Sequence, residues 1–149
     1  MSADQQFMSA ALELARIAGD AGEVPVGAVA VREDRIVGTG SNSPISRNDP
    51  TAHAEMLALR EAARTLGNYR LEDVTLYVSL EPCVMCAGAL VQARVRRLVF
   101  GARDLRFGGV RGKFRLADTE LLNHRVEVVE GVLAVECMEL LQEFFRTRR

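Results

Sequence analysis

The sequence predicts an α/β fold of three layers, α/β/α, with helices on both faces of a mixed five-stranded sheet. The main observation is the spacing of apolar residues, which predicts helices and strands in the order α-β-β-α-β-α-β-β-α along the chain. The length of 149 residues and the hydrophobic content of 48% fit a packed core, so we expect residues 1–149 to form a single domain. No linker, repeat or low-complexity segment divides the chain.

The first half of the chain predicts a helix, a hairpin and a second helix. Apolar residues at helical spacing indicate an amphipathic helix over residues 5–18. The apolar run 24–31 indicates a buried strand, and a turn at Glu33-Asp34 leads into an antiparallel partner over 35–40. Residues 41–50, SNSPISRNDP, have the composition of a loop. Pro50 and Gly67-Asn68 then bound a helix predicted over 51–65.

The second half alternates strands and helices. We expect a strand over 74–79, a helix over 83–94, a strand over 97–100, a short strand over 126–129 and a helix from about 134 to the end. A glycine-bearing loop follows residue 100. Strands that are joined by helices are usually parallel, so the later strands should be largely parallel.

Composition and charge exclude some functions and leave one question open. No apolar run approaches the roughly 20 residues of a membrane span, and the N-terminus has the pattern of an amphipathic helix rather than a signal peptide. We therefore expect a cytoplasmic protein without membrane contact. The net charge is −1, but residues 94–115 carry eight basic residues against Asp104 alone. This segment is either a face that binds a polyanion or a solvated surface.

Four residues in two short motifs predict a catalytic zinc site. His53, Cys83 and Cys86 are the ligand types that Zn²⁺ prefers, and three ligands leave the fourth tetrahedral position to water. Both motifs lie where a loop becomes a helix, and a helix N-terminus favours thiolate over thiol. Glu55 lies about 200° around the helix from His53, so it does not simply duplicate that ligand. It is instead placed to move protons between a zinc-activated water and a substrate.

The joint pattern H-x-E followed by P-C-x-x-C is the signature of zinc-dependent nucleobase deaminases. Over essentially the whole chain, the segments EVPVGAV (23–29), NDPTAHAE (48–55), LEPCVMCAGA (80–89), VFGARD (99–104) and NHRVEV (123–128) resemble those of bacterial tRNA-specific adenosine deaminases. These belong to the zinc-dependent cytidine/deoxycytidylate deaminase superfamily. The resemblance implies a cytidine-deaminase-like fold and the conversion of adenosine to inosine at the wobble position of a tRNA anticodon, chiefly of an arginine tRNA. It also implies a homodimer with one Zn²⁺ per subunit.

The resemblance also implies roles for individual residues. His53, Cys83 and Cys86 would bind zinc, and Glu55 would be the catalytic proton shuttle. The residues implied to contact the tRNA anticodon stem-loop are Asn42 at the target nucleoside, Val26 and the Ala54 backbone in the base pocket, Asp104 beside the ribose and backbone, and Phe145, Arg148 and Arg149 on the last helix. Residues 107–122 depart from the family pattern, because Phe107 and several basic residues replace a run rich in small residues.

Two other functions are compatible with parts of this pattern. A deaminase of free cytosine, cytidine or guanine would use the same zinc core. A non-catalytic RNA-binding module stabilised by zinc would need a fourth protein ligand. The only other histidine is His124 and the only other cysteine is Cys137. We expect His124 to form a local hydrogen bond and Cys137 to be buried in the core of the last helix.

Overall fold

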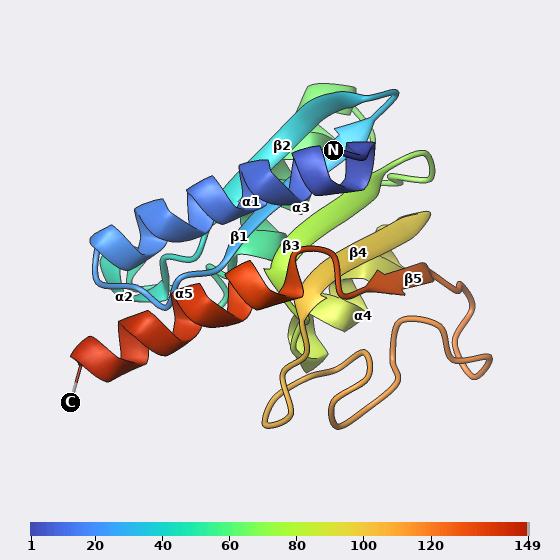
Figure 1. Cartoon of the computed structure of the whole chain (residues 1–149). Helices are drawn as coiled ribbons and strands as arrows, with labels where there is room; N and C mark the ends of the chain where they lie inside the picture. Colours follow the sequence, from blue (N-terminus) through green and yellow to red (C-terminus); the bar gives the residue numbers. More distant parts are fainter. Residues whose placement is uncertain (149) are drawn as a thin grey trace.

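The structure is a computed structural model that describes residues 1–148 (Figure 1). Its helices are α1 (Ala3–Asp20), α2 (Pro44–Arg47), α3 (Ala54–Leu66), α4 (Val84–Gln92) and α5 (Ala134–Thr147), and its strands are β1 (Gly27–Arg32), β2 (Arg35–Ser41), β3 (Thr75–Leu80), β4 (Arg97–Ala102) and β5 (Glu127–Glu130). Every helix and strand predicted from the sequence is present. The short helix α2 is an addition, and it lies inside the segment 41–50 that we predicted to be a loop.

The five strands form one mixed sheet in the order β2-β1-β3-β4-β5. Strand β1 pairs antiparallel with β2, as predicted for a hairpin, and also antiparallel with β3. The pairs β3–β4 and β4–β5 are parallel, which confirms the prediction for the later strands. Because β1 lies between β2 and β3, the connection through α3 passes from the edge of the sheet across β1 to its centre.

Helices cover both faces of this sheet, so the predicted three-layer α/β architecture is confirmed (Figure 1). On one face, α1 and α5 pack against alternate strand residues, which include Val29, Tyr77 and Val99. On the other face, α3 and α4 pack against the intervening strand residues, which include Ala30, Val78 and Phe100. The alternation of side chains along a strand explains why each strand contributes to two separate cores.

The start of α3 differs from the sequence prediction by three residues. The helix begins at Ala54 with His53 as its N-cap, because the preceding residues form a separate turn. In that turn, the Asp49 side chain accepts hydrogen bonds from the backbone N–H and the hydroxyl of Thr51. A Cβ at Gly40 of β2 would collide with the Ala54 carbonyl oxygen, so glycine at this position allows the first turn of α3 to lie directly on the sheet.

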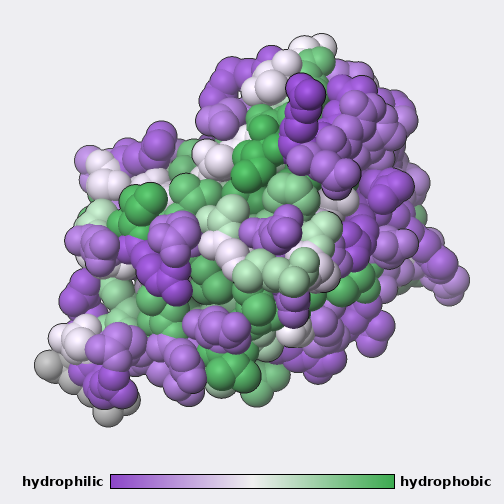
Figure 2. Space-filling view, turned by 45° about the horizontal axis from the view of Figure 1, so that its top comes forward, coloured by the Kyte–Doolittle hydropathy of each residue, from purple (hydrophilic) through white to green (hydrophobic). Residues whose placement is uncertain are grey.

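The connection between β4 and β5 has no helix, although these two strands are parallel. It runs over residues 103–126 and carries most of the basic segment (Figure 1). Figure 2 shows hydrophilic residues over much of one face of the molecule, with apolar residues gathered in patches between them. Within residues 1–148, no helix is both long enough and apolar enough to cross a membrane.

Candidate active site

The three predicted metal ligands meet at the N-termini of two helices. His53 is the N-cap of α3, Cys83 is the N-cap of α4, and Cys86 lies one turn further into α4. The Nδ1 atom of His53 is 3.5 Å from the Sγ atom of Cys83 and 3.5 Å from that of Cys86. A tetrahedral zinc with ordinary Zn–N and Zn–S bonds would separate these atoms by about 3.5 Å, so the residues fit this ion. Among residues 1–148, they are the only such group of three.

The electrostatics of the cluster also favour a cation. Hydrogen bonds from the Cys86 thiol and from His53 lower the pKa of Cys83 to about 4, although burial opposes this. The adjacent Cys83 thiolate and burial raise the pKa of Cys86. The pKa of His53 is raised, mainly by its hydrogen bond to Cys83. Without a metal, the Cys83 thiolate is thus stabilised by protons on Cys86 and His53, and a divalent cation bound between the three donor atoms would take the place of these protons.

Glu55 lies beside this cluster, and its side chain is almost completely buried, with 4% of its surface exposed. Burial raises the pKa of Glu55 to about 7, and its own backbone N–H and the charge of His53 act in the opposite direction. A carboxyl group with this pKa can both accept and donate a proton near neutral pH. The structure thus places a buried carboxyl group next to the candidate metal site.

A cavity of about 380 Å³ opens onto the cluster, which is a size typical of small-molecule sites. Its lining residues are Val24, Val26, Asn42, Pro44, His53, Glu55, Leu80, Glu81, Cys83, Asp104 and Phe107. Val26, Asn42 and Asp104 therefore line the same cavity as His53 and Cys83, two of the candidate metal ligands. The Ala54 side chain is fully buried in the core, so only its backbone can face a ligand.

Asn42 is fixed on one side of this cavity. Its side-chain Nδ2 donates a hydrogen bond to the Val24 carbonyl at 3.2 Å, and its backbone N–H donates to the Val26 carbonyl at 3.0 Å. The following helix α2 is held by Glu23, whose carboxylate accepts hydrogen bonds from the backbone N–H groups of Ile45 and Ser46. The position of Asn42 and Pro44 at the cavity is thus determined by a buried network.

The opposite side of the cavity is formed by the loop after β4. The carboxylate of Asp104 accepts hydrogen bonds from the backbone N–H groups of Arg106 and Phe107, both at 3.0 Å. The Phe107 ring is 64% exposed, and the Arg106 guanidinium lies 5.6 Å from its centroid. No role was predicted for the cavity residues Val24, Pro44, Leu80 and Glu81, although Leu80 and Glu81 lie in the segment LEPCVMCAGA, which resembles the family.

The predicted contacts on the last helix lie outside the cavity. Phe145 is 52% exposed and packs edge-on against Phe144, with the ring centroids 5.3 Å apart. The Arg148 guanidinium lies 4.4 Å from the centroid of the Phe144 ring, next to a second hollow that includes Pro25. The segment 24–26 therefore connects this hollow to the cavity. Arg149 lies outside the described residues.

Part of the basic segment 94–115 is neutralised by acidic partners. Three of its arginines form ion pairs: Arg97 with Asp4 and Glu127, Arg103 with Glu130, and Arg111 with Asp118. Arg106, Lys113 and Arg115 have no acidic partner within residues 1–148 and are exposed. Positive charge without an ion-pair partner therefore remains in the loop that borders the cavity, and also at Arg94 and Arg96, which precede β4.

The remaining histidine and cysteine do not approach the cluster. The Nε2 atom of His124 is 2.8 Å from the Val95 carbonyl oxygen, so His124 does form a hydrogen bond, but with a residue 29 positions earlier and not with a local one as expected. Cys137 is buried in the core against α1, as expected. No fourth protein ligand is thus found among the residues described, which argues against a closed structural zinc site.

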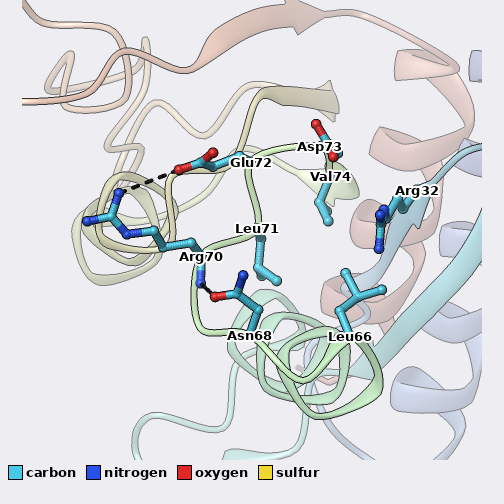
Figure 3. Close-up of a pocket in the computed structure, with 8 residues that line it drawn as sticks. All are labelled: Arg32, Leu66, Asn68, Arg70, Leu71, Glu72, Asp73 and Val74. Carbon is cyan, nitrogen blue, oxygen red and sulfur yellow. Dashed lines mark hydrogen bonds and ion pairs between the residues drawn. The ribbon is translucent and has the colours of Figure 1, made fainter.

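A different cavity, of about 270 Å³, lies at the other end of the sheet (Figure 3). It is lined by Arg32 at the end of β1 and by the segment before β3, in which Arg70 contacts Asn68 and Glu72. Val31 pairs with Thr75 at the start of β3, whereas Cys83 and Cys86 follow the end of β3. This cavity is therefore remote from the candidate active site.

Comparison with known proteins identifies the family. A family model described as MafB19-like deaminase matches residues 2–149. The tRNA-specific adenosine deaminase of Haemophilus influenzae is 52% identical over 147 residues, which are 98% of this chain and 85% of that protein. The chain belongs to the tRNA-specific adenosine deaminase family. The resemblance found in the sequence is thereby confirmed, and the cluster of His53, Glu55, Cys83 and Cys86 is the candidate active site of a deaminase.

Solved structures agree with this assignment. A structure from a study of A-to-I editing by tRNA:A34 deaminases at the wobble position of transfer RNA has a TM-score of 0.88 and 43% identity, and the match covers 91% of this deaminase and 99% of that chain. A guanine deaminase from Nitrosomonas europaea has a TM-score of 0.81 and 29% identity, over 94% of this deaminase and 83% of that chain. The fold is therefore shared by deaminases with different substrates.

Proposed function

We propose that this protein hydrolyses adenosine to inosine at the wobble position of a tRNA anticodon, chiefly of an arginine tRNA, and that residues 1–149 act as one catalytic domain. The observation that carries the choice of substrate is the identity of 52% to a tRNA-specific adenosine deaminase over 98% of the chain. The chemistry is supported by the cavity, which has metal-ligand side chains and a buried carboxyl group on one wall.

In the proposed mechanism, His53, Cys83 and Cys86 would hold one Zn²⁺ per subunit. When bound, the ion supplies an activated water for attack on C6 of adenine. The Glu55 carboxylate takes one proton from the water and delivers it to N1 of the ring. It then takes the second proton from the oxygen now bonded to C6 and delivers it to the amine on C6. The bond between C6 and this amine breaks, so ammonia leaves and the oxygen from water remains in inosine.

The proposed contacts divide the remaining residues between base and backbone. Asn42, Val26 and the Ala54 backbone would hold the flipped adenosine, and Asp104 would contact the adjacent ribose and phosphodiester backbone. Phe145, Arg148 and Arg149 would contact the anticodon stem-loop further away. Extrusion of a base costs less from a single-stranded loop than from a duplex, which fits an anticodon loop as substrate. Because the proposed substrate is a tRNA, we expect the protein to work in the cytoplasm.

We also propose that the protein is a homodimer. Several large apolar side chains in α4 and in the connection between β4 and β5 are exposed. Among them are Val84 at 47%, Phe114 at 55% and Leu121 at 89%. Exposed apolar groups of this kind support an interface with another protein chain. Analytical ultracentrifugation of the metal-loaded protein would measure the oligomeric state, and a monomer at micromolar concentration would contradict this proposal.

The proposed substrate is tested by product analysis. The metal-loaded protein is incubated with anticodon stem-loops that carry A, C or G at the wobble position, and in parallel with free adenosine, cytidine and guanine. We expect inosine from the stem-loop with A and little product from the free compounds. Deamination of free guanine or cytidine without activity on any stem-loop would overturn the proposal in favour of a small-molecule deaminase. Bound zinc with no product from any substrate would favour the non-catalytic module.

A further inference from the structure

Glu81 is a buried carboxylate two residues before the metal ligand Cys83, and only 2% of its surface is exposed. It accepts four hydrogen bonds, all from backbone N–H groups. Its Oε1 atom accepts from Asp104 at 3.0 Å, and its Oε2 atom accepts from Val110 at 3.0 Å, Arg111 at 2.6 Å and Gly112 at 2.8 Å. Within residues 1–148, no basic side chain forms an ion pair with it. The charge of Glu81 is therefore compensated by the main chain of one loop.

These four bonds close the loop 104–112 on itself. Its first residue and its last three residues bind the same carboxylate, while the Asp104 carbonyl accepts a hydrogen bond from Gly108 at 3.0 Å. Convergent backbone N–H groups form a concave site for an anion, and here the anion is a side chain of the same protein. The turn that carries Asp104 and Phe107 to the cavity is thus held from its inner side by Glu81.

The loop also fits tightly against the segment that leads to the metal ligand. A Cβ at Gly108 would collide with the Glu81 carboxylate, and a Cβ at Gly112 would collide with the Asp104 carbonyl oxygen. The backbone N–H of Gly109 donates to the Pro82 carbonyl at 2.8 Å, and Gly108 forms an isolated bridge with Cys83. The glycines therefore allow the loop to enclose Glu81 closely, so that its position is fixed relative to the metal ligands.

We propose that Glu81 is a positioning residue for deamination: its carboxylate fixes the loop 104–112 so that Asp104 and Phe107 form a rigid rim of the cavity. Glu81 takes no part in proton transfer, because its carboxylate oxygens are occupied by the loop amides. If the substrate is the tRNA of the proposed function, on which this inference rests, the rim contacts nucleotides next to the target adenosine. A loosened rim weakens substrate binding more than it slows the chemical step, since His53, Glu55 and Cys86 lie on other segments.

The test compares Glu81→Gln with the wild-type protein, both loaded with zinc. Glutamine keeps the shape of the side chain but replaces one acceptor oxygen by a donor group, so at least one loop N–H loses its partner. We expect KM for the anticodon stem-loop to rise by about tenfold or more, with kcat reduced by less than about threefold and with unchanged zinc content. Hydrogen–deuterium exchange should increase at residues 110–112 and remain unchanged in α3.

Two further variants keep the test decisive if Glu81→Gln folds poorly. Gly112→Ala disturbs the same loop without altering Glu81, so it should raise KM in the same way. Asp4→Asn is the matched control, because it removes another partly buried carboxylate far from the cavity, and it should leave KM unchanged. An unchanged KM in both loop variants, or a kcat that falls as much as KM rises, would overturn the role of Glu81.

Hydrogen–deuterium exchange tests the role of Glu81 independently of which substrate the enzyme uses. If the wild-type protein acts only on a free base, the assignment of tRNA as substrate fails, and the KM comparison is repeated with that base. Faster exchange in the loop together with a raised KM would still support Glu81 as a positioning residue. Protection of residues 110–112 that does not change in Glu81→Gln would refute it with any substrate.

Discussion

Replacing Glu55 should reduce catalytic turnover without changing the metal content of the protein. In Glu55→Gln, we expect turnover to fall by at least about 10²- to 10⁴-fold, because no group remains beside the metal ligands to transfer protons. The zinc content should stay the same, since Glu55 is not among the three donors. Inosine formation from a stem-loop and metal analysis of the same sample would measure both. Turnover close to that of the wild type would show that another group transfers the proton.

Individual glycines set how closely helices approach the sheet. Gly40→Ala places a methyl group against the first turn of α3, so we expect a loss of about 1–3 kcal/mol in the free energy of unfolding and weaker zinc binding through His53. Gly88→Ala is the matched control, because no atom lies within 4 Å of a Cβ there and the position is inside α4. Helix propensity predicts that this variant is about as stable as the wild type or more stable. Denaturant unfolding would compare the two, and equal losses would contradict the argument.

At the scale of elements, the first turn of α1 is attached to the centre of the sheet. Asp4 accepts two hydrogen bonds from Arg97 of β4, at 2.9 and 2.6 Å, and one from the hydroxyl of Tyr77 of β3 at 2.7 Å. The hydrogen bonds from Arg97 lower the pKa of Asp4, although burial opposes them, and that from Tyr77 contributes in the same direction. This network connects the N-terminal helix to two strands that follow it by more than seventy residues.

We therefore predict a pH-dependent contribution of Asp4 to stability. Because the pKa of Asp4 is lower in the folded state, its contribution is fully present above the unfolded pKa of about 4 and is lost as the pH falls through the folded pKa. Asp4→Asn should cost about 1–2 kcal/mol at pH 7, and the difference from the wild type should shrink below pH 4. Thermal unfolding at several pH values would measure it. The control Glu13→Gln removes an exposed ion pair on the same helix and should have little effect at any pH.

The order of elements was predictable because it depends on local patterns of apolar residues. Each strand and long helix has a period that can be recognised within ten residues, and the hairpin β1–β2 has a turn between its strands. Two features depend on contacts between distant residues and could not be predicted in this way. The insertion of β1 between β2 and β3 is a tertiary choice, and α2 is held by Glu23, which lies some twenty residues earlier in the chain.

The site was predictable to a similar extent. The candidate metal ligands and Glu55 have chemically distinctive side chains at diagnostic spacing, so they could be proposed before the fold was known, and the structure brings the three candidate ligands together. Glu81 carries no such signal, because a glutamate is more often a solvated surface residue than a buried one. The ion pairs of the segment 94–115 could not be predicted either, because Arg97, Arg103 and Arg111 find acidic partners that lie elsewhere in the sequence.

At the scale of the whole molecule, metal binding should contribute to global stability. A ligand that binds only the folded state adds about 2.7 kcal/mol when its concentration is 100 times its Kd. We expect a strong chelator to lower the Tm of the wild-type protein, and added Zn²⁺ to restore it. The variant His53→Ala should respond to neither treatment, because two thiolates remain without the imidazole donor. A Tm that is identical with and without chelator would show that the cluster does not hold a metal in the folded state.

The position of β1 has a consequence for how the protein folds. His53 and Cys83 are separated by 30 residues in the sequence, and their helices start from β2 and β3, which are not neighbours in the sheet. We therefore expect a complete set of donor atoms to form only after β1 has been inserted between β2 and β3, which is a non-local event. The absorption of tetrahedral Co²⁺, followed after dilution from denaturant, would therefore report the moment at which the sheet is complete.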